Sequence, residues 1–323
     1  MSRFYNALKE ASRSQLGADG KSGNEADAIG ESGANIPEFL GADAIGENGV
    51  SIPELLDRAE PVEEKVPASQ PLDPVVASKP AVSEAAEKSG PPAPRGDHPK
   101  VVFDPSARVI PHAADSIVVE YYRRLRTKVL QQHAAKPFRT LVVTSPGPQE
   151  GKTVTVLNLG LSFAMLPDLK VLVIDGDLRR GSLGKWLRVG EHPGLSNLLD
   201  GSAKLEDTVL KYGDGPLSFL VRGTSPASPA ELLHSMDLRK HFQHMEEQFD
   251  LVLVDSPPIN LITDTQLLAA CCDAVLLIAR AFQTTRKAFE KAVQDLAPFR
   301  VIGTVLNGGT KVQPYRKYGG YYY

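Results

Sequence analysis

The chain has 323 residues, a formal net charge of -3 and a sequence pI of about 6.2. This charge excludes a strongly basic protein with a general affinity for nucleic acid or anionic lipid. The two cysteines, Cys271 and Cys272, are adjacent in an apolar segment, which favours reduced thiols over a disulfide or a zinc site. We find no run near the roughly 18 apolar residues of a membrane-spanning helix and no signal-peptide core. We therefore expect a cytoplasmic protein without a nucleic-acid partner.

Residues 1–13 have the pattern of a short amphipathic helix. Phe4, Leu8 and Ala11 are spaced to share one helix face, and charged residues surround them. A helix of this length is marginal on its own. Two interpretations stay open: a frayed terminus, or a docking helix that folds on a partner.

Residues 14–111 have the composition of a disordered linker, rich in Gly, Ala, Pro, Glu and Ser. No Phe, Trp or Tyr occurs between Phe39 and Phe103, so this range cannot bury enough apolar surface to offset its ordering entropy. The segment from Pro61 to Pro99 holds nine prolines and predicts an extended, semi-stiff spacer.

A tandem repeat lies inside this linker, with one copy at residues 26–40 and the other at 42–56. Two copies are too few for a solenoid. The repeat is either a duplication in a tolerant linker or a pair of short linear motifs. In the second case Ile36-Pro37-Glu38-Phe39 and Ile52-Pro53-Glu54-Leu55 would bind one receptor.

Residues 112–310 predict a folded domain in which helices and apolar strands alternate. A first helix is expected over 116–132. The strands that follow are expected at 140–144, 170–175, 217–221, 251–255, 274–279 and 301–306, and the helices from Lys152 and at 195–199, 230–248, 264–272 and 284–296. Because several strands are continuous Val/Leu/Ile runs, we expect an α/β fold with a doubly wound, mostly parallel sheet and helices on both faces. Ligands of such sheets bind at the carboxyl ends of the strands.

A phosphate-binding loop follows the strand at 140–144. The segment from Ser145 to Thr153 ends in Gly-Lys-Thr before a helix, an arrangement that wraps backbone N–H groups around a polyphosphate. Lys152 is the expected phosphate lysine and Thr153 the expected Mg²⁺ hydroxyl. A strict Walker A sequence has glycine at the position of Pro146, whereas here the glycine comes one residue later.

Two other strands end in carboxylates. Asp255 follows the apolar run 251–254, as a Walker B carboxylate does. Asp175 and Asp177 follow the apolar run 171–174. This second pair is either a solvated turn or two groups that divide the work, one near an attacking hydroxyl and one on the water shell of the metal.

With these motifs the chain resembles the bacterial tyrosine kinases (BY-kinases) of the capsular and exopolysaccharide type, within the Walker A/A′/B P-loop ATPases. That family carries a modified Walker A loop, an acidic Walker A′ strand, an Asp-x-Pro-Pro Walker B and a C-terminal tyrosine cluster. The corresponding segments here are Ser145 to Thr153, Asp175 to Arg179, Asp255-Ser256-Pro257-Pro258, and Tyr315, Tyr318, Tyr321, Tyr322 and Tyr323. Glu120, Arg123 and Arg126 are similar to the Glu-x-x-Arg-x-x-Arg subunit-contact motif of the family. The match covers roughly residues 113–323, and Gly181 departs from the usual proline.

The resemblance implies ATP and Mg²⁺ as cofactors and a role for each matching residue. The implied nucleotide contacts are Gly147, Glu150, Gly151, Lys152, Thr153, Val154 and Asn307. Thr153, Asp177 and Asp255 are implied to hold Mg²⁺, and Lys152, Asp175, Asp177 and Asp255 to act in catalysis, with Asp175 activating the tyrosine hydroxyl. For Asn307 a loop-capping role is an open alternative.

Residues 311–323 predict a flexible tail, in which Gly319 and Gly320 give the tyrosines freedom to reach a cleft. The tail is either a phosphate acceptor or an aromatic adhesive for another protein. The resemblance implies autophosphorylation in trans within a homo-oligomer. It also implies a separate membrane-embedded chain-length regulator as activator, recruitment to the inner face of the plasma membrane, and a cognate phosphatase.

The competing function is a P-loop ATPase switch of the partition and division-site type. It shares the fold and would turn over ATP without phosphorylating tyrosine.

Overall fold

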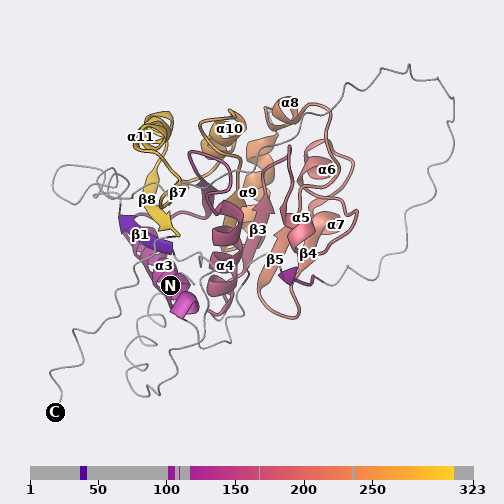
Figure 1. Ribbon diagram of the computed structural model, residues 1–323. Helices are drawn as coiled ribbons and strands as arrows, with labels where there is room; N and C mark the ends of the chain where they lie inside the picture. Colours follow the sequence, from indigo (N-terminus) through magenta and orange to yellow (C-terminus); the bar gives the residue numbers. More distant parts are fainter. Residues whose placement is uncertain are drawn as a thin grey trace, which may run out of the picture.

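The computed structural model describes residues 37–41, 101–105, 109, 117–166, 168–234 and 237–308, and within 37–41 only the backbone. Figure 1 shows these residues as one sheet with helices against both of its faces. The predictions for residues 1–13, for the second repeat copy and for the tail lie outside the described residues. So does most of the predicted linker.

Among the described residues, the sheet has eight strands in the order β1-β8-β7-β2-β6-β3-β5-β4. The strands are β1 (Pro37–Gly41), β2 (Thr140–Thr144), β3 (Val171–Asp175), β4 (Val209–Lys211), β5 (Leu217–Leu220), β6 (Leu251–Asp255), β7 (Ala274–Arg280) and β8 (Val301–Asn307). All neighbours from β8 to β5 are parallel, and β1 and β4 are antiparallel strands at the two edges. The predicted mostly parallel sheet is therefore confirmed.

Helices cover the sheet on two sides. They are α3 (Ile117–Ala135), α4 (Lys152–Ala164), α5 (Leu183–Trp186), α6 (Leu195–Leu199), α7 (Leu205–Thr208), α8 (Pro229–Leu233), α9 (Leu238–Gln248), α10 (Asp264–Cys271) and α11 (Arg286–Asp295). Apolar side chains of α3, α4 and α5 form one core layer, and those of α6 to α11 pack on the opposite face. In this described part, each helix falls short of the combined length and apolarity that crossing a membrane requires.

The central strands are apolar throughout because both of their faces are covered. In β2, for example, Leu141 and Val143 belong to the α3/α4 layer, whereas Val142 belongs to the layer under α9 and α10. All three side chains are fully buried. Alternate residues of a strand point to opposite faces, so a doubly covered strand needs an uninterrupted apolar run.

The structure divides the long helix predicted at 230–248. Pro229 occupies the first turn of α8, and the chain closes that helix at His234, whose N–H donates to the carbonyl of Ala230 (2.9 Å). Asp237 is the N-cap of α9. The elements α5, α7 and β4, of three or four residues each, were not predicted because they are too short to show a period.

Two short segments of the predicted linker range are ordered against the domain. One is β1, which pairs with β8. The other is 101–105, where the Phe103 ring lies 5.1 Å from the Tyr212 ring and 6.1 Å from the Phe219 ring. Phe103 is the first aromatic residue after Phe39, and its ring packs against the core of the domain. It therefore gives this segment the apolar surface that the residues just before it lack.

Candidate active site

The three predicted motifs meet at the carboxyl ends of three adjacent strands. The loop 145–151 follows β2, Asp255 ends β6 and Asp175 ends β3. β6 lies between the other two strands, and the β3–β6 register places Asp175 directly opposite Asp255. Sheet topology thus brings together segments that lie far apart in sequence, since Ser145 and Asp255 are 110 residues apart.

The phosphate-binding loop ends in a left-handed residue. Gly151 has φ 96° and is the N-cap of α4, and this conformation is one that favours glycine. Lys152 begins the helix with 9% of its surface exposed, and its Nζ donates to Ser145 Oγ (3.1 Å). Burial lowers the pKa of Lys152, and the charge of Asp255 opposes that shift. The ammonium group has three donors, which suits an anion held inside the loop.

Glu150 and Asn307 hold the loop from within the protein. The Glu150 carboxylate accepts bonds from Thr284 Oγ1 (2.6 Å) and from the Gly147 N–H (3.1 Å), and burial raises its pKa. Asn307 Nδ2 donates to the Glu150 carbonyl (3.0 Å), and Asn307 is fully buried. These contacts correspond to the loop-capping alternative for Asn307. Nucleotide contacts of Glu150, Asn307 and the largely buried Val154 stay predictions.

Thr153 and Asp255 form a hydroxyl–carboxylate pair. Thr153 Oγ1 donates to Asp255 Oδ2 (2.5 Å) and lies 3.4 Å from Ser182 Oγ. The other oxygen, Asp255 Oδ1, is buried without a hydrogen-bond partner. Burial raises the pKa of Asp255 to about 6, and Lys152 and the Thr153 bond oppose the shift.

This pair fits Mg²⁺, which accepts hydroxyl and carboxylate oxygens and keeps several ligands from water and phosphate. Asp255 Oδ1 is buried without a hydrogen-bond partner, as is Asn307 Oδ1 beside the loop, and a cation next to Asp255 would satisfy its free oxygen. Within the described ranges no three His, Cys, Asp or Glu residues form a cluster that could hold a metal. The residues therefore fit a metal shared with a bound phosphate, and not a metal held by protein side chains alone.

Asp175 is fully buried, which excludes the solvated-turn interpretation for this residue. Its carboxylate accepts bonds from the N–H groups of Leu183 (2.9 Å) and Asp177 (3.3 Å). Burial raises the pKa of Asp175 to about 8, and the neighbouring charge of Asp255 adds to the shift. A buried carboxyl with a raised pKa at a strand end is a candidate for proton transfer.

Asp177 is half-buried and caps the turn after β3. Its Oδ1 accepts bonds from the N–H groups of Arg179 (3.2 Å) and Arg180 (2.9 Å). Gly181 closes the turn with φ 55°, and its N–H donates to the Asp177 carbonyl (2.8 Å). Proline cannot adopt a positive φ and has no N–H. Because Gly181 stands where the family usually has proline, this turn has a positive φ and a backbone hydrogen bond that proline could not provide.

Several partners of the predicted motif residues were missed from the sequence. Arg179 forms a bidentate ion pair with the buried Asp264 of α10, with Nε–Oδ2 at 2.8 Å and Nη2–Oδ1 at 3.2 Å. The Thr284 hydroxyl donates a hydrogen bond to the Glu150 carboxylate. The Ser182 hydroxyl lies near the Thr153 hydroxyl. Asp264, Thr284 and Ser182 follow no local motif, and only the presence of hydroxyl and carboxylate types just beyond strand ends could have indicated them.

The predicted subunit-contact residues differ in exposure. Arg126 is 6% exposed, and its Nη1 donates to the Ser162 carbonyl (2.5 Å), so it joins α3 to α4 within the chain. Glu120 and Arg123 pair with each other at 3.6 Å, and their side chains are about 40% exposed or more. A contact between subunits through α3 stays a prediction, with Glu120 and Arg123 on the accessible side.

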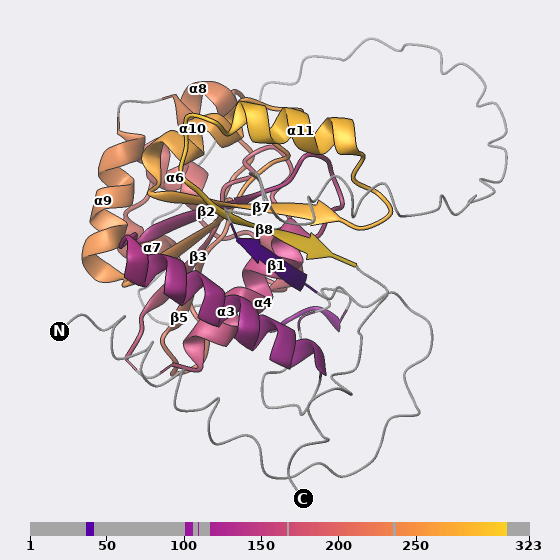
Figure 2. The same ribbon diagram turned by 90° about the vertical axis from the view of Figure 1, so that its left-hand side faces the viewer.

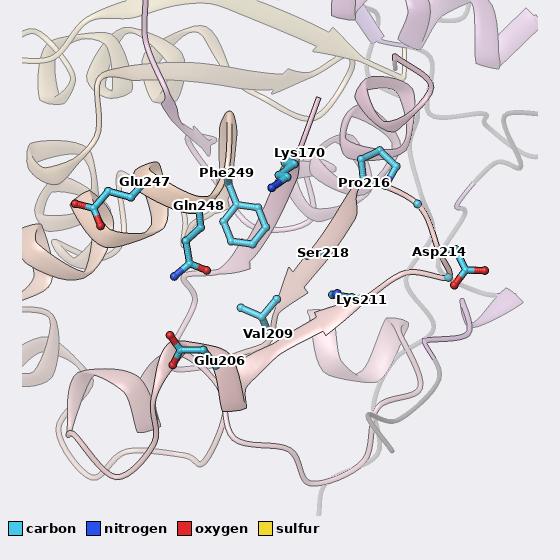
Figure 3. A pocket seen from close by; sticks show the side chains of 12 residues that line it. Lys170, Glu206, Val209, Lys211, Asp214, Pro216, Ser218, Glu247, Gln248 and Phe249 are labelled. Atoms are coloured by element: carbon cyan, nitrogen blue, oxygen red, sulfur yellow. The ribbon is translucent and has the colours of Figure 1, made fainter. Parts of the chain in front are cut away.

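Two cavities lie at opposite ends of the strands. One of about 660 Å³ borders the Walker A′ turn and is lined by Gly181, Lys185 and, after β5, by Arg222. The other, of about 670 Å³, is lined by Lys170, which precedes β3, and by residues of β4, the β4–β5 turn and the end of α9 (Figure 3). The second cavity is at the amino ends of the strands, so it is separate from the strand-end carboxylates.

No family model matches the chain. The chain is 36% identical over 197 residues to the tyrosine-protein kinase ptk of Acinetobacter johnsonii, covering 60% of this chain and 27% of that protein. It is 32% identical over 206 residues to the tyrosine-protein kinase CpsD of Streptococcus agalactiae, covering 62% of this chain and 89% of that protein. A solved structure, the kinase domain of the Escherichia coli tyrosine kinase ETK, superposes with a TM-score of 0.57 at 32% identity, over 62% of this chain and 80% of that one. The chain thus matches about a quarter of the first relative and most of the second.

Proposed function

Because the chain belongs to the family of bacterial tyrosine kinases (BY-kinases), we propose that it transfers the γ-phosphoryl group of ATP to tyrosine hydroxyls. The observation that carries this proposal is the pairing of two buried carboxylates, Asp175 and Asp255, across β3 and β6 beside the phosphate-binding loop. Asp255 is bonded to Thr153, which leaves Asp175 as a second carboxylate for the acceptor.

In the proposed reaction the loop from Ser145 to Thr153 holds the ATP phosphates, and Lys152 places its charge on the β and γ oxygens. Thr153 and Asp255 would hold Mg²⁺, and Asp177 would support it. When bound, this metal neutralises charge that develops on the phosphate oxygens. The ionised form of Asp175, which its raised pKa makes a stronger base than an ordinary carboxylate, accepts the tyrosine proton. The phenol oxygen forms the new bond to the γ phosphorus, the bond to the bridging oxygen breaks, and ADP leaves with the electron pair.

The proposed acceptors are Tyr315, Tyr318, Tyr321, Tyr322 and Tyr323 of a second copy of the chain. The cavity beside Gly181 and Arg222 borders the Walker A′ turn and provides an approach for an extended peptide. Phosphorylation adds about 1.5 to 2 negative charges per tyrosine, which would repel the acidic site and release the tail. The oligomer would associate through α3.

By its family, the kinase is proposed to regulate the polymerisation or export of a capsular or exopolysaccharide. Its proposed partners are a membrane-embedded chain-length regulator, which activates it at the inner face of the plasma membrane, and a tyrosine phosphatase. Each of these is an expectation from the family alone.

The test is to incubate the purified chain with Mg-ATP and to measure phosphotyrosine and ADP together. Lys152→Met is expected to lose both products, because the phosphates lose their cation. Asp175→Asn is expected to bind ATP and lose phosphotyrosine. ADP formation by the unaltered chain without phosphotyrosine would reject the kinase and favour the ATPase switch.

Truncation after Thr310 tests the acceptor assignment. It removes all five tail tyrosines and none of the described residues. ATP binding should persist and phosphotyrosine should disappear. Persistent phosphotyrosine in the truncated chain would exclude the tail as the main acceptor.

A further inference from the structure

The outer edge of β8 is occupied by a segment from the first repeat copy. β1 pairs with β8 over five residues, from Pro37 opposite Asn307 to Gly41 opposite Gly303. The other edge of β8 pairs with β7. In Figure 2, β1 also runs beside α3, and Cα atoms of the two elements lie within 8 Å of each other. Without β1, a row of backbone N–H and C=O groups would be open at this edge.

The second repeat copy shares three of the five paired residues. Pro37-Glu38-Phe39-Leu40-Gly41 corresponds to Pro53-Glu54-Leu55-Leu56-Asp57. The position opposite Val305 is a large apolar residue in both copies, and the position opposite Thr304 is leucine in both. Proline stands at the first residue of the strand, where a missing N–H is tolerated. Strand addition takes its affinity from main-chain bonds and its specificity from alternate side chains, so both copies meet its requirements.

We propose that the outer edge of β8 is a binding site for the Ile-Pro-Glu-(Phe/Leu)-Leu motif, and that the second copy at 52–56 replaces the first on this edge of the same chain. Two copies joined by a short linker compete for one site, each at an effective concentration on the order of millimolar. The edge therefore stays covered when one copy leaves. This proposal does not depend on the kinase reaction.

The site lies beside the phosphate-binding loop. The paired segment ends at Asn307, whose side chain bonds the Glu150 carbonyl of the loop (3.0 Å). The next residue, Gly308, has φ 77° and leads toward the tail. Val305 and Leu306 each face a different core layer, so β8 is held in place from both faces while its edge accepts the motif.

Hydrogen exchange of the full chain without nucleotide, read by mass spectrometry with fragmentation inside residues 301–307, tests the proposal. One variant carries Glu38→Pro and Leu40→Pro, a second carries Glu54→Pro and Leu56→Pro, and a third combines all four. Proline removes the N–H that a ladder needs. We expect each two-site variant to protect the outward amides of β8 like the unaltered chain, and the combined variant to exchange them at least about tenfold faster.

Two results would overturn the proposal. Unchanged protection in the combined variant would mean that neither copy covers the edge. Exchange in the first-copy variant as fast as in the combined one would mean that the second copy does not replace the first. An unchanged urea midpoint in all variants is the control that separates edge opening from global unfolding.

A synthetic peptide of residues 50–58 provides an independent measurement. Added to the combined variant, it should restore β8 protection, and the same peptide with Leu55→Pro should not. Failure of the unaltered peptide to restore protection would reject the second copy as an occupant. Protection in the first-copy variant should also be independent of protein concentration. Loss of that protection on dilution would assign the occupant to a second copy of the chain and overturn the same-chain assignment.

Discussion

The pH dependence of folding tests the environment assigned to Asp175. Its carboxyl group is fully buried, with a pKa raised from the ordinary 3.8 to about 8, first by burial and then by the charge of Asp255. Between these two values the folded protein keeps a proton that the unfolded chain releases. The contribution of the neutral carboxyl to stability is thus complete below pH 3.8 and is lost as the pH rises through about 8. Asp175→Asn removes this titration and retains a side-chain acceptor for one of its two N–H donors.

The size of the effect follows from the two pKa values. A full proton difference changes the free energy of unfolding by about 1.4 kcal/mol per pH unit. Between pH 5 and pH 8, a group titrating near 4 when unfolded and near 8 when folded costs the protein roughly 3.5 kcal/mol of stability. We expect the stability of Asp175→Asn relative to the unaltered chain to increase by about 2 to 4 kcal/mol over this range. The difference in the free energy of unfolding between the two proteins at pH 5 also includes the lost hydrogen bond, so only its change with pH tests the assignment.

The assay is equilibrium unfolding in urea at pH 5, 6, 7 and 8, with EDTA and without nucleotide. Comparing the two proteins at each pH cancels the other groups that titrate in both. Equal m-values would verify that both unfold the same surface. A stability difference that stays constant within about 0.5 kcal/mol from pH 5 to pH 8 would refute the buried, raised-pKa assignment.

Three further predictions concern the frame of the site. Gly194→Ala should lower the free energy of unfolding, measured in urea, by more than about 2 kcal/mol, because the added Cβ would lie 2.1 Å from the carbonyl oxygen of Val221. Gly190→Ala is the control: a Cβ added there has no atom within 4 Å, so the free energy of unfolding should change by less than about 0.5 kcal/mol. Thr284→Val should weaken ATP binding about tenfold in calorimetry by removing the bond to the loop glutamate, whereas Thr284→Ser should bind normally. Arg179→Ala should destabilise the fold by roughly 1 to 3 kcal/mol, since it leaves the buried carboxylate of Asp264 unpaired; a double-mutant cycle with Asp264→Asn that yields no coupling would contradict this.

Local patterns were sufficient for the parallel sheet and for the three motifs. The apolar runs before Ser145, Asp175 and Asp255 are continuous because both faces of these strands are covered, and this feature is visible in five residues of sequence. Parallel strands place their carboxyl ends at one edge of the sheet, so the sequence predicts that the loop and the carboxylates lie close together.

The side chains that surround the three motifs depend on the tertiary structure. The bonds from Thr284 and Asn307 to Glu150 join residues 134 and 157 positions apart, and no spacing in the sequence announces such partners. The burial of Arg126 likewise depends on how α4 lies against α3. The first repeat copy is the clearest case, because a strand at an edge is defined by the partner whose backbone it pairs with. The repeated motif is visible in the residues alone, whereas the β8 edge that one copy occupies exists only in the folded domain.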